Sequence, residues 1–230
     1  MSVSLRVVVP FAAERPKTRL GGVLSAAERR AFADAMLTDV LAAVETAGHE
    51  PTVLTTAALD RSVSQIVDER PLDTAVDAVV TDATPTHDRP LAVVMADLAL
   101  ATPTAIRRLT EPSGQTGERL DGQPGERPTD DPADLVFAPG LGGGTNAIVV
   151  RDPRFRTDYH GASITDHRQV ATELDATTRE VDSRRLATDI DTPSDLAELL
   201  LHGEGAAHDW LVDAGFELDT ADGRVGVTRE

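Results

Sequence analysis

Leu5-Arg-Val-Val-Val-Pro-Phe-Ala-Ala-Glu-Arg-Pro-Lys17-Thr-Arg19 is the stretch of sequence that decides the fold. Its first part, Leu5 to Pro10, is almost wholly apolar and rich in β-branched residues, which is typical of a strand buried in a parallel sheet. Its second part is a polar loop that leads to Gly21-Gly22. An open α/β sheet binds phosphate groups beyond the carboxyl ends of its strands, so this loop is a candidate phosphate site.

The loop carries Lys17, the single lysine of the chain, two residues before Arg19. A lysine in such a loop can serve as a flexible point charge for a polyphosphate. The alternative is a solvated surface cation, which is the commoner role of a lysine. Lys17 is the single lysine of the chain and comes shortly after the first strand, and both facts favour the phosphate-binding role.

The composition limits the classes of partner. The 230 residues carry a formal net charge of -17 and contain no cysteine. Such a surface repels nucleic acid, so we expect no nucleic-acid partner. Abundant Asp and Glu with one lysine indicate a halophilic protein, whose self-repulsion is screened in molar salt. The absence of cysteine excludes disulfides and thiolate zinc sites. No apolar run approaches the ~20 residues of a membrane span and no signal-peptide pattern opens the chain, which predicts a cytoplasmic protein without membrane contact.

Apolar segments of regular length recur along the chain, which argues against a disordered acidic protein. Their alternation predicts an α/β fold of three layers, a mostly parallel sheet with helices on both faces. Ser25 and Glu28 form a capping-box pattern, and Gly48 ends that helix. The expected strands are 5–10, 51–55, 62–67, 91–95, 134–138 and 146–150, with a strand-like step before Asp189; the expected helices are 26–46, 72–83, 103–109, one capped by Ser163, and 193–201.

The expected domain organisation is one domain over 1–202 and a C-terminal extension over 203–230 that packs on it. The extension is expected to form a short helix and a hairpin turning near Gly223. The segment 111–132 is rich in Gly, Pro and charged residues, and we expect a mobile surface insertion there. No Gly-Lys-Ser/Thr P-loop occurs, and the glycine run 140–144 precedes a strand, which excludes a dinucleotide fingerprint.

Three further clusters carry groups suited to chemistry. Asp97 ends an expected buried strand, Gly142-Gly-Gly-Thr-Asn146 lets backbone amides approach a ligand, and Asp189-Ile-Asp191 precedes a helix. Each has a plain structural alternative. These are a helix cap or turn residue for Asp97, an ordinary glycine turn for the glycine-rich segment, and helix capping by Asp191 or Thr192.

Together with Lys17, these clusters suit magnesium-dependent handling of a nucleoside triphosphate. Mg²⁺ takes one or two carboxylates and completes its shell with phosphate oxygens and water, so Asp97 and Asp191 are the candidate metal ligands. Lys17 and Arg19 would neutralise the charge that builds on departing pyrophosphate.

A set of short motifs runs in order from about Leu5 to Leu201. They are Val8-Val-Pro10, Lys17-Thr-Arg-Leu20, Met36-Leu-Thr-Asp-Val-Leu41, Ala96-Asp-Leu-Ala-Leu100, Ala138-Pro139, Gly142-Gly-Gly-Thr-Asn-Ala147, Tyr159-His-Gly-Ala-Ser163 and Asp189-Ile-Asp-Thr-Pro-Ser-Asp-Leu196. With these motifs the chain resembles the 2-phospho-L-lactate guanylyltransferase family of coenzyme F420 biosynthesis, in its haloarchaeal form. Two residues depart from the family pattern. Ala99 replaces a common proline, and Leu141 replaces an arginine that often precedes the triple glycine.

The resemblance implies a nucleotidyltransferase with a glycosyltransferase-A-like fold. It implies transfer of GMP from GTP to the phosphate of 2-phospho-L-lactate, which gives lactyl-diphospho-guanosine and pyrophosphate. The implied roles are catalysis by Lys17, Arg19, Asp97 and Asp191, with Mg²⁺ on the two aspartates; nucleotide binding by Pro10, Lys17, Gly143 and Gly144; and phospho-acid binding by Thr145, Asn146, Gly161 and Ser163.

Other interpretations stay open. A nucleotidyltransferase of the same fold could use phosphoenolpyruvate, 3-phosphoglycerate or another phosphorylated acceptor, and a non-catalytic nucleotide-binding protein would need no metal. His160 and His167 flank the acceptor segment, and polar roles in a loop or on a helix surface are commoner for them than substrate contact. A homodimer also stays open, because no residue pattern decides the oligomeric state.

Overall fold

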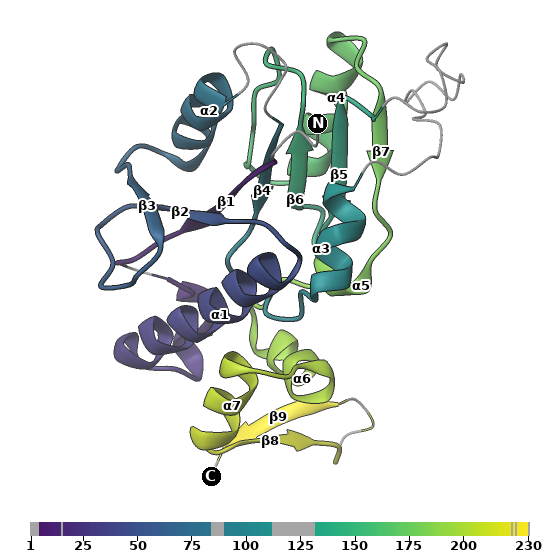
Figure 1. Ribbon diagram of the computed structural model, residues 1–230. Coiled ribbons are helices and arrows are strands. Elements are labelled where there is room, and N and C mark those ends of the chain that lie inside the picture. Colours follow the sequence, from purple (N-terminus) through teal and green to yellow (C-terminus); the bar gives the residue numbers. More distant parts are fainter. Residues whose placement is uncertain are drawn as a thin grey trace.

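A seven-stranded sheet in the order β3-β2-β1-β4-β6-β5-β7 forms the centre of the molecule (Figure 1). The computed structural model describes residues 5–14, 16–83, 90–111, 132–221, 223 and 225–229. The strands of this sheet are β1 (Arg6–Phe11), β2 (Pro51–Thr55), β3 (Ser64–Val67), β4 (Leu91–Val94), β5 (Leu135–Pro139), β6 (Thr145–Val150) and β7 (Thr178–Glu180). The other elements are η1 (Thr18–Gly22), α1 (Ala26–Thr46), α2 (Leu72–Ala83), α3 (Pro103–Thr110), α4 (Ser163–Glu173), α5 (Arg184–Ala187), α6 (Pro193–His202), α7 (Ala206–Asp213), β8 (Phe216–Asp219) and β9 (Gly226–Arg229).

The sheet is mostly parallel, as predicted, with β6 as its antiparallel member. β1 pairs in parallel with β2 and β4, and so do β2 with β3 and β5 with β7. β6 runs antiparallel to both of its neighbours, β4 and β5. The turn 140–144 that joins β5 to β6 is short, and so short a connection joins neighbouring strands as an antiparallel hairpin.

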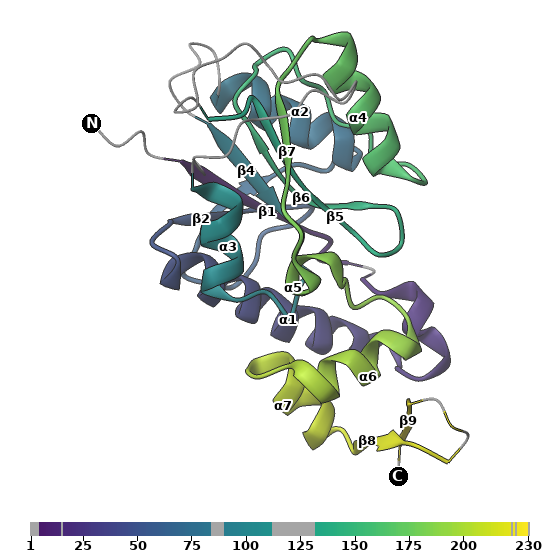
Figure 2. The ribbon, with the colours of Figure 1, turned by 90° about the vertical axis from the view of Figure 1, so that its right-hand side faces the viewer.

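Helices cover both faces of the sheet, as Figures 1 and 2 show. Successive side chains of a strand point to opposite faces. Val7 and Val9 of β1 therefore pack with α1 and α3, whereas Val8 packs in the cluster that includes α2 and α4. The predicted three-layer α/β architecture is confirmed.

The long helix α1 is buried on two sides. Its start follows the predicted capping box, in which Glu28 N donates to Ser25 Oγ at 3.3 Å and Ser25 N donates to Glu28 Oε2 at 2.7 Å. Val40 and Val44 pack on the sheet, while Phe32 and Met36 belong to a third apolar cluster shared with α6 and α7. A helix between two packed layers needs apolar residues around most of its circumference.

The C-terminal extension lies against α1, beyond the carboxyl ends of the parallel strands (Figure 2). It forms helix α7 and the hairpin β8-β9, the elements predicted for it. The carboxylate of Asp39 on α1 accepts hydrogen bonds from the backbone N–H groups of Ala206 and Ala207, at 2.7 and 2.8 Å. Acidic groups stabilise helix N-termini, so Asp39 fixes the start of α7.

Several features differ from the expectations or lie beyond them. The short helices η1 and α5 were not predicted, and the strand-like step expected just before Asp189 is not formed, because β7 ends at Glu180 and α5 precedes Asp189. The prediction that Ser163 caps its helix was wrong, because Ser163 is the first residue of α4 and Ala162 occupies the cap position without a side-chain bond. The expected mobile insertion, 111–132, lies outside the described residues except at its two ends.

The acidic composition gives a testable salt dependence. We expect the protein to lose structure or activity in about 0.1 M KCl and to regain it in molar KCl. The acidic side chains behind the net charge of -17 repel one another. The Debye length that sets the range of this repulsion is ~10 Å at 0.1 M salt but only ~3 Å at 1 M. Circular dichroism across a KCl titration would measure the effect, with sorbitol of equal osmolality as the control. Full stability at 0.1 M would contradict the halophilic interpretation.

Candidate active site

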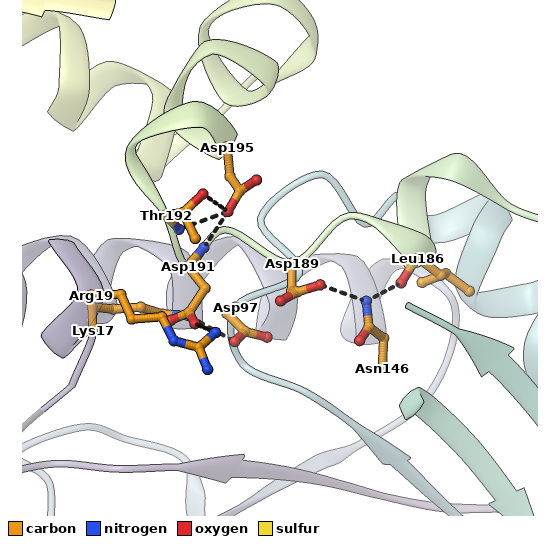
Figure 3. Close-up of polar contacts among 9 residues, drawn as sticks. All are labelled: Lys17, Arg19, Asp97, Asn146, Leu186, Asp189, Asp191, Thr192 and Asp195. Carbon is orange, nitrogen blue, oxygen red and sulfur yellow. Dashed lines mark hydrogen bonds and ion pairs between the residues drawn. The ribbon is translucent and has the colours of Figure 1, made fainter. Parts of the chain in front are cut away.

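The loop after β1 brings Lys17 into the protein instead of leaving it in solvent. Its backbone is left-handed, with φ 55° and ψ 45°. Residues other than glycine rarely adopt this region, and such conformations cluster at functional sites. The Lys17 side chain is only 9% exposed, and its Nζ lies 2.8 Å from Asp97 Oδ2 and 3.5 Å from Asp191 Oδ1 (Figure 3).

Two loops position the aspartates. Asp97 follows β4, and its backbone carbonyl accepts a hydrogen bond from Ile190 N at 3.1 Å, which joins the two aspartate loops. Asp195 Oδ2 accepts from the backbone N–H groups of Asp191 and Thr192, at 3.1 and 2.7 Å. Thr192 is the N-cap of α6 and Asp195 completes a capping box. Capping therefore employs Thr192 and Asp195, which leaves the Asp191 carboxylate for the cations.

The charges in this cluster keep Lys17 protonated. Burial by itself would lower the pKa of Lys17, but the carboxylates of Asp97 and Asp191 outweigh it and the pKa is raised. Arg19 Nη1 contacts the other oxygen of Asp191 at 2.7 Å, although the Arg19 side chain is 73% exposed. The predicted cations and carboxylates thus meet at one place, beyond the carboxyl ends of β1 and β4 (Figure 3).

The donor set at this place fits a divalent cation. Among the described residues, Asp97 Oδ1 is one of the few buried side-chain atoms without a hydrogen-bond partner. A buried acceptor left unpaired is costly, and an oxygen-seeking ion would satisfy it. Lys17 Nζ already lies between the Asp97 and Asp191 carboxylates, which shows that they converge on a position for positive charge.

Asp189 belongs to the same site, although the sequence prediction selected Asp191 alone. Burial and the nearby charge of Asp97 raise the pKa of Asp189, and Lys17 partly offsets this. The Asp-Ile-Asp spacing was the available signal, since alternate residues of an extended segment point to the same side. Asn146 Nδ2 donates hydrogen bonds to Asp189 Oδ1 at 3.3 Å and to the Leu186 carbonyl at 3.0 Å (Figure 3). Asn146 was predicted to bind substrate, and here its amide orients Asp189.

A second group of predicted residues lies around the start of α4. The backbone N–H of Thr145 donates to Ser163 Oγ at 2.9 Å, and both residues are buried. His167 is fully buried, so the expected helix-surface role was wrong for it. Its Nε2 accepts from Asp158 N at 2.8 Å, so Nδ1 of the neutral ring carries the proton and donates to Thr145 Oγ1 at 2.8 Å. Burial lowers the pKa of His167 to about 4, which keeps the ring neutral.

The predicted glycines lie beside this second group. Gly140 N donates to the Gly144 carbonyl at 2.8 Å and closes the turn between β5 and β6, in which Gly143 has φ 85°. The Gly143 carbonyl accepts from Ile164 N at 3.2 Å, which joins the turn to α4. Gly161 also has a positive φ, 56°, and open space beside its Cα. The glycine turn and the start of α4 thus form one backbone-lined corner.

A cavity of about 320 Å³ opens beside the Lys17 cluster. Its lining includes Pro10, Lys17, Asp97 and Asp191 among the predicted site residues, whereas the corner at α4 does not line it.

Another acidic group, made of Asp73, Asp158 and His160, has ligand atoms within 4.8 Å of one another, but His160 is 83% exposed. None of the helices in the described part of the chain has the length and apolar character that a membrane span needs.

Residues 5–118 and 127–230 match the family model described as "Guanylyl transferase CofC like". The chain belongs to this family. A relative of this guanylyl transferase family in Halomicrobium mukohataei, named 2-phospho-L-lactate guanylyltransferase, is 53% identical over 225 residues, which is 98% of this chain and all of the relative. A protein of the same name from Haloarcula marismortui is 52% identical over 225 residues, which is 98% of this chain and 99% of that relative.

Solved structures place the family in the nucleotidyltransferase fold. A protein of Desulfovibrio desulfuricans assigned as a nucleotide-diphospho-sugar transferase gives a TM-score of 0.67 at 13% identity, with 93% of this chain and 95% of that chain covered. A nucleotidyl transferase from Methanothermobacter thermautotroptrophicus gives 0.57 at 15% identity, with 91% and 99% covered. At such identities the likeness shows the fold, and it confirms the fold class predicted for this guanylyl transferase.

Proposed function

We propose that the chain transfers GMP from GTP to the phosphate of 2-phospho-L-lactate, as a step of coenzyme F420 biosynthesis. The products are lactyl-diphospho-guanosine and pyrophosphate. The observation that carries this proposal is the convergence of Lys17, Asp97 and Asp191 beside a cavity at the carboxyl edge of the sheet. It is supported by near-full-length relatives that bear the name of this activity.

The reaction needs positioning and charge neutralisation more than proton transfer. An oxygen of the acceptor phosphate attacks the α-phosphorus of GTP and forms a new P–O bond. The bond from the α-phosphorus to the bridging oxygen breaks, and pyrophosphate leaves with the electron pair. A phosphate monoester is mostly ionised at neutral pH, since its second pKa is about 6, so no general base is required.

The Lys17 cluster supplies the charge chemistry. Asp97 and Asp191 would hold Mg²⁺, with Asp189 close by, and the bound ion would withdraw charge from the triphosphate oxygens. The ammonium of Lys17 and the guanidinium of Arg19 would bind the β- and γ-phosphates and stabilise the leaving pyrophosphate. Arg19 is exposed and can follow the ligand, whereas Lys17 is buried and preorganised.

The acceptor would lie against the corner formed by the glycine turn and the start of α4. The N-terminus of a helix suits a phosphate or a carboxylate. Thr145 and Ser163 are bonded to each other there, and they would hold the corner in shape while backbone groups near Gly143, Gly144 and Gly161 face the ligand.

A product assay tests the proposal. We expect pyrophosphate release from GTP with 2-phospho-L-lactate in molar KCl and Mg²⁺, and a product with the mass of lactyl-diphospho-guanosine. Phosphoenolpyruvate and 3-phosphoglycerate are the comparison acceptors. Faster turnover with either of them would reassign the acceptor, and no pyrophosphate release with any of the three would contradict the proposed reaction.

A further inference from the structure

The cavity has a polar group that the triphosphate chemistry leaves unused. Three carboxylates of the described residues line it: Asp97 and Asp191, both bonded to Lys17, and Asp68. Asp68 comes directly after β3, and its backbone N–H donates to the Thr55 carbonyl at 2.9 Å, which fixes it at the edge of the sheet. In the order β3-β2-β1-β4, three strand spacings of ~4.8 Å separate β3 from β4, the strand that Asp97 follows, or about 14 Å. Asp68 therefore lies toward the opposite end of the cavity from Asp97.

The wall between these ends is largely apolar. It includes Pro10, Leu54, Ala75 and Met95. Ligand sites of this kind bind a flat apolar body on their walls and orient it through a few polar groups. A nucleoside triphosphate carries its base and its phosphates on opposite sides of the ribose. With the phosphates at Lys17, the base extends along this wall toward β3.

We propose that the Asp68 carboxylate recognises the guanine of GTP by accepting hydrogen bonds from its N1–H and 2-amino groups. This inference rests on the proposed function, because it takes GTP as the occupant of the cavity. A carboxylate is an acceptor with two oxygens side by side, which matches the two parallel donors of guanine. Adenine has no 2-amino group and presents a lone pair at N1, so it would face the carboxylate acceptor to acceptor.

The contact with Arg70 shows that this carboxylate can bind such a donor pair. Arg70 Nε donates to Asp68 Oδ1 at 2.9 Å, and Nη2 donates to Oδ2 at 2.5 Å. The N1–C2–N2 part of guanine is itself a guanidine fragment with the same two donors. The Asp68 side chain is 13% exposed and its Oδ1 is also bonded to Arg70 N at 3.0 Å, whereas the Arg70 side chain is 53% exposed. The carboxylate is thus fixed, and the exposed arginine head group is the partner that would give way to a base.

The same contacts keep Asp68 ionised. The side-chain hydrogen bond from Arg70 is the largest cause that lowers the pKa of Asp68, to about 2. When the arginine head group gives way to a base, the backbone hydrogen bond from Arg70 N still lowers the pKa of Asp68, so the carboxylate remains an acceptor at neutral pH and offers no proton to adenine N1. The competing explanation is local, since a pair two residues apart also stabilises a turn. Nucleotide preference separates the two explanations, because a turn contact has no reason to distinguish bases.

The test compares GTP, ITP and ATP in the full-length protein, with 2-phospho-L-lactate as acceptor. ITP differs from GTP only by the missing 2-amino group. In the wild type we expect kcat/KM to fall about 10- to 100-fold from GTP to ITP, the range for one hydrogen bond to a charged group, and further for ATP. In Asp68→Asn the preference for GTP over ITP should shrink to about threefold or less. Glu69→Gln, an exposed neighbour that does not line the cavity, is the matched control and should keep the wild-type preference.

The nucleotide ratio within one variant does not depend on the fraction of folded protein, so partial unfolding of Asp68→Asn leaves the test intact. A wild-type GTP-to-ITP ratio in Asp68→Asn would overturn the proposal and leave the Asp68–Arg70 pair as a turn contact. A wild type that uses ITP as well as GTP would overturn it without any variant. Both results leave guanylyl transfer standing, whereas absence of turnover with all nucleotides would count against the proposed function itself.

Discussion

Asp97→Asn is expected to abolish most guanylyl transfer while leaving the fold intact. The substitution keeps the size of the side chain and removes its charge. Asp97 Oδ1 is buried without a partner, and Oδ2 is the nearer carboxylate contact of Lys17. Losing this proposed Mg²⁺ ligand would remove several kcal/mol of charge stabilisation, which corresponds to a fall in kcat of at least about 100-fold. Asp191→Asn should act in the same direction, with Arg19 losing its partner as well.

Turnover against Mg²⁺ concentration is the measurement for both variants. We expect the dependence to weaken and shift to higher concentration, with matched circular dichroism spectra. Asp213→Asn removes one charge from an exposed position at the end of α7 and is the control for net charge. Wild-type turnover in Asp97→Asn, with an intact spectrum, would remove Asp97 from the metal site.

Several elements of the fold could be predicted because local chemistry decides them. The start of α1 depends on Ser25 and Glu28, and α2 has the predicted bounds of 72–83. The short turn 140–144 decides that β6 runs antiparallel to β5, but the place of β6 in the sheet could not be predicted in the same way. An apolar run buried on both faces carries no mark of its neighbours, so the sequence does not reveal that β6 lies between β4 and β5.

In the candidate site, too, some features could be predicted from the sequence and others depend on tertiary contacts. Residues at the carboxyl ends of β1 and β4 had to lie at one edge of the sheet, so the meeting of Lys17 with Asp97 could be expected. Contacts between loops could not be expected from the sequence in this way. The bond from Asn146 to Asp189 spans the chain from β6 to the segment before α6, and no local pattern encodes it.

The role of His167 was missed for a related reason. Its position on α4 suggests a polar helix surface, but the tertiary fold encloses its ring among Phe137, Phe155 and Tyr159. Burial of a histidine is decided by what packs on the helix, which its own neighbours in sequence do not reveal. The enclosed ring then holds Thr145, so a residue implied as a substrate ligand is also part of a buried hydrogen-bond network.

Lys17→Met is expected to lower turnover by roughly 100-fold or more, the scale for removing one preorganised electrostatic stabiliser. The substitution keeps most of the side-chain stem and removes the ammonium. The proposed contact of Lys17 with the phosphates would strengthen as charge moves onto the pyrophosphate leaving group. The loss should therefore appear in kcat more than in the KM for GTP.

The structure adds a second consequence of losing Lys17. Its ammonium lies between Asp97 and Asp191, so these carboxylates lose the cation that offsets their repulsion. Arg19 remains on Asp191, which limits the effect on folding. A thermal melt should therefore show a smaller change than the turnover. Arg30→Met, which removes a positive charge from an exposed position on α1, is the matched control.

Lys17→Arg separates charge from shape. Arginine restores the positive charge, but its planar fork differs from a compact ammonium, and the side chain at this position is 9% exposed. We expect only partial recovery of turnover, because the fork would have to displace one of the carboxylates that hold the present geometry. Near wild-type turnover in Lys17→Met would show that the buried ammonium only balances Asp97 and Asp191. Arg19 would then be the cation that stabilises the leaving pyrophosphate.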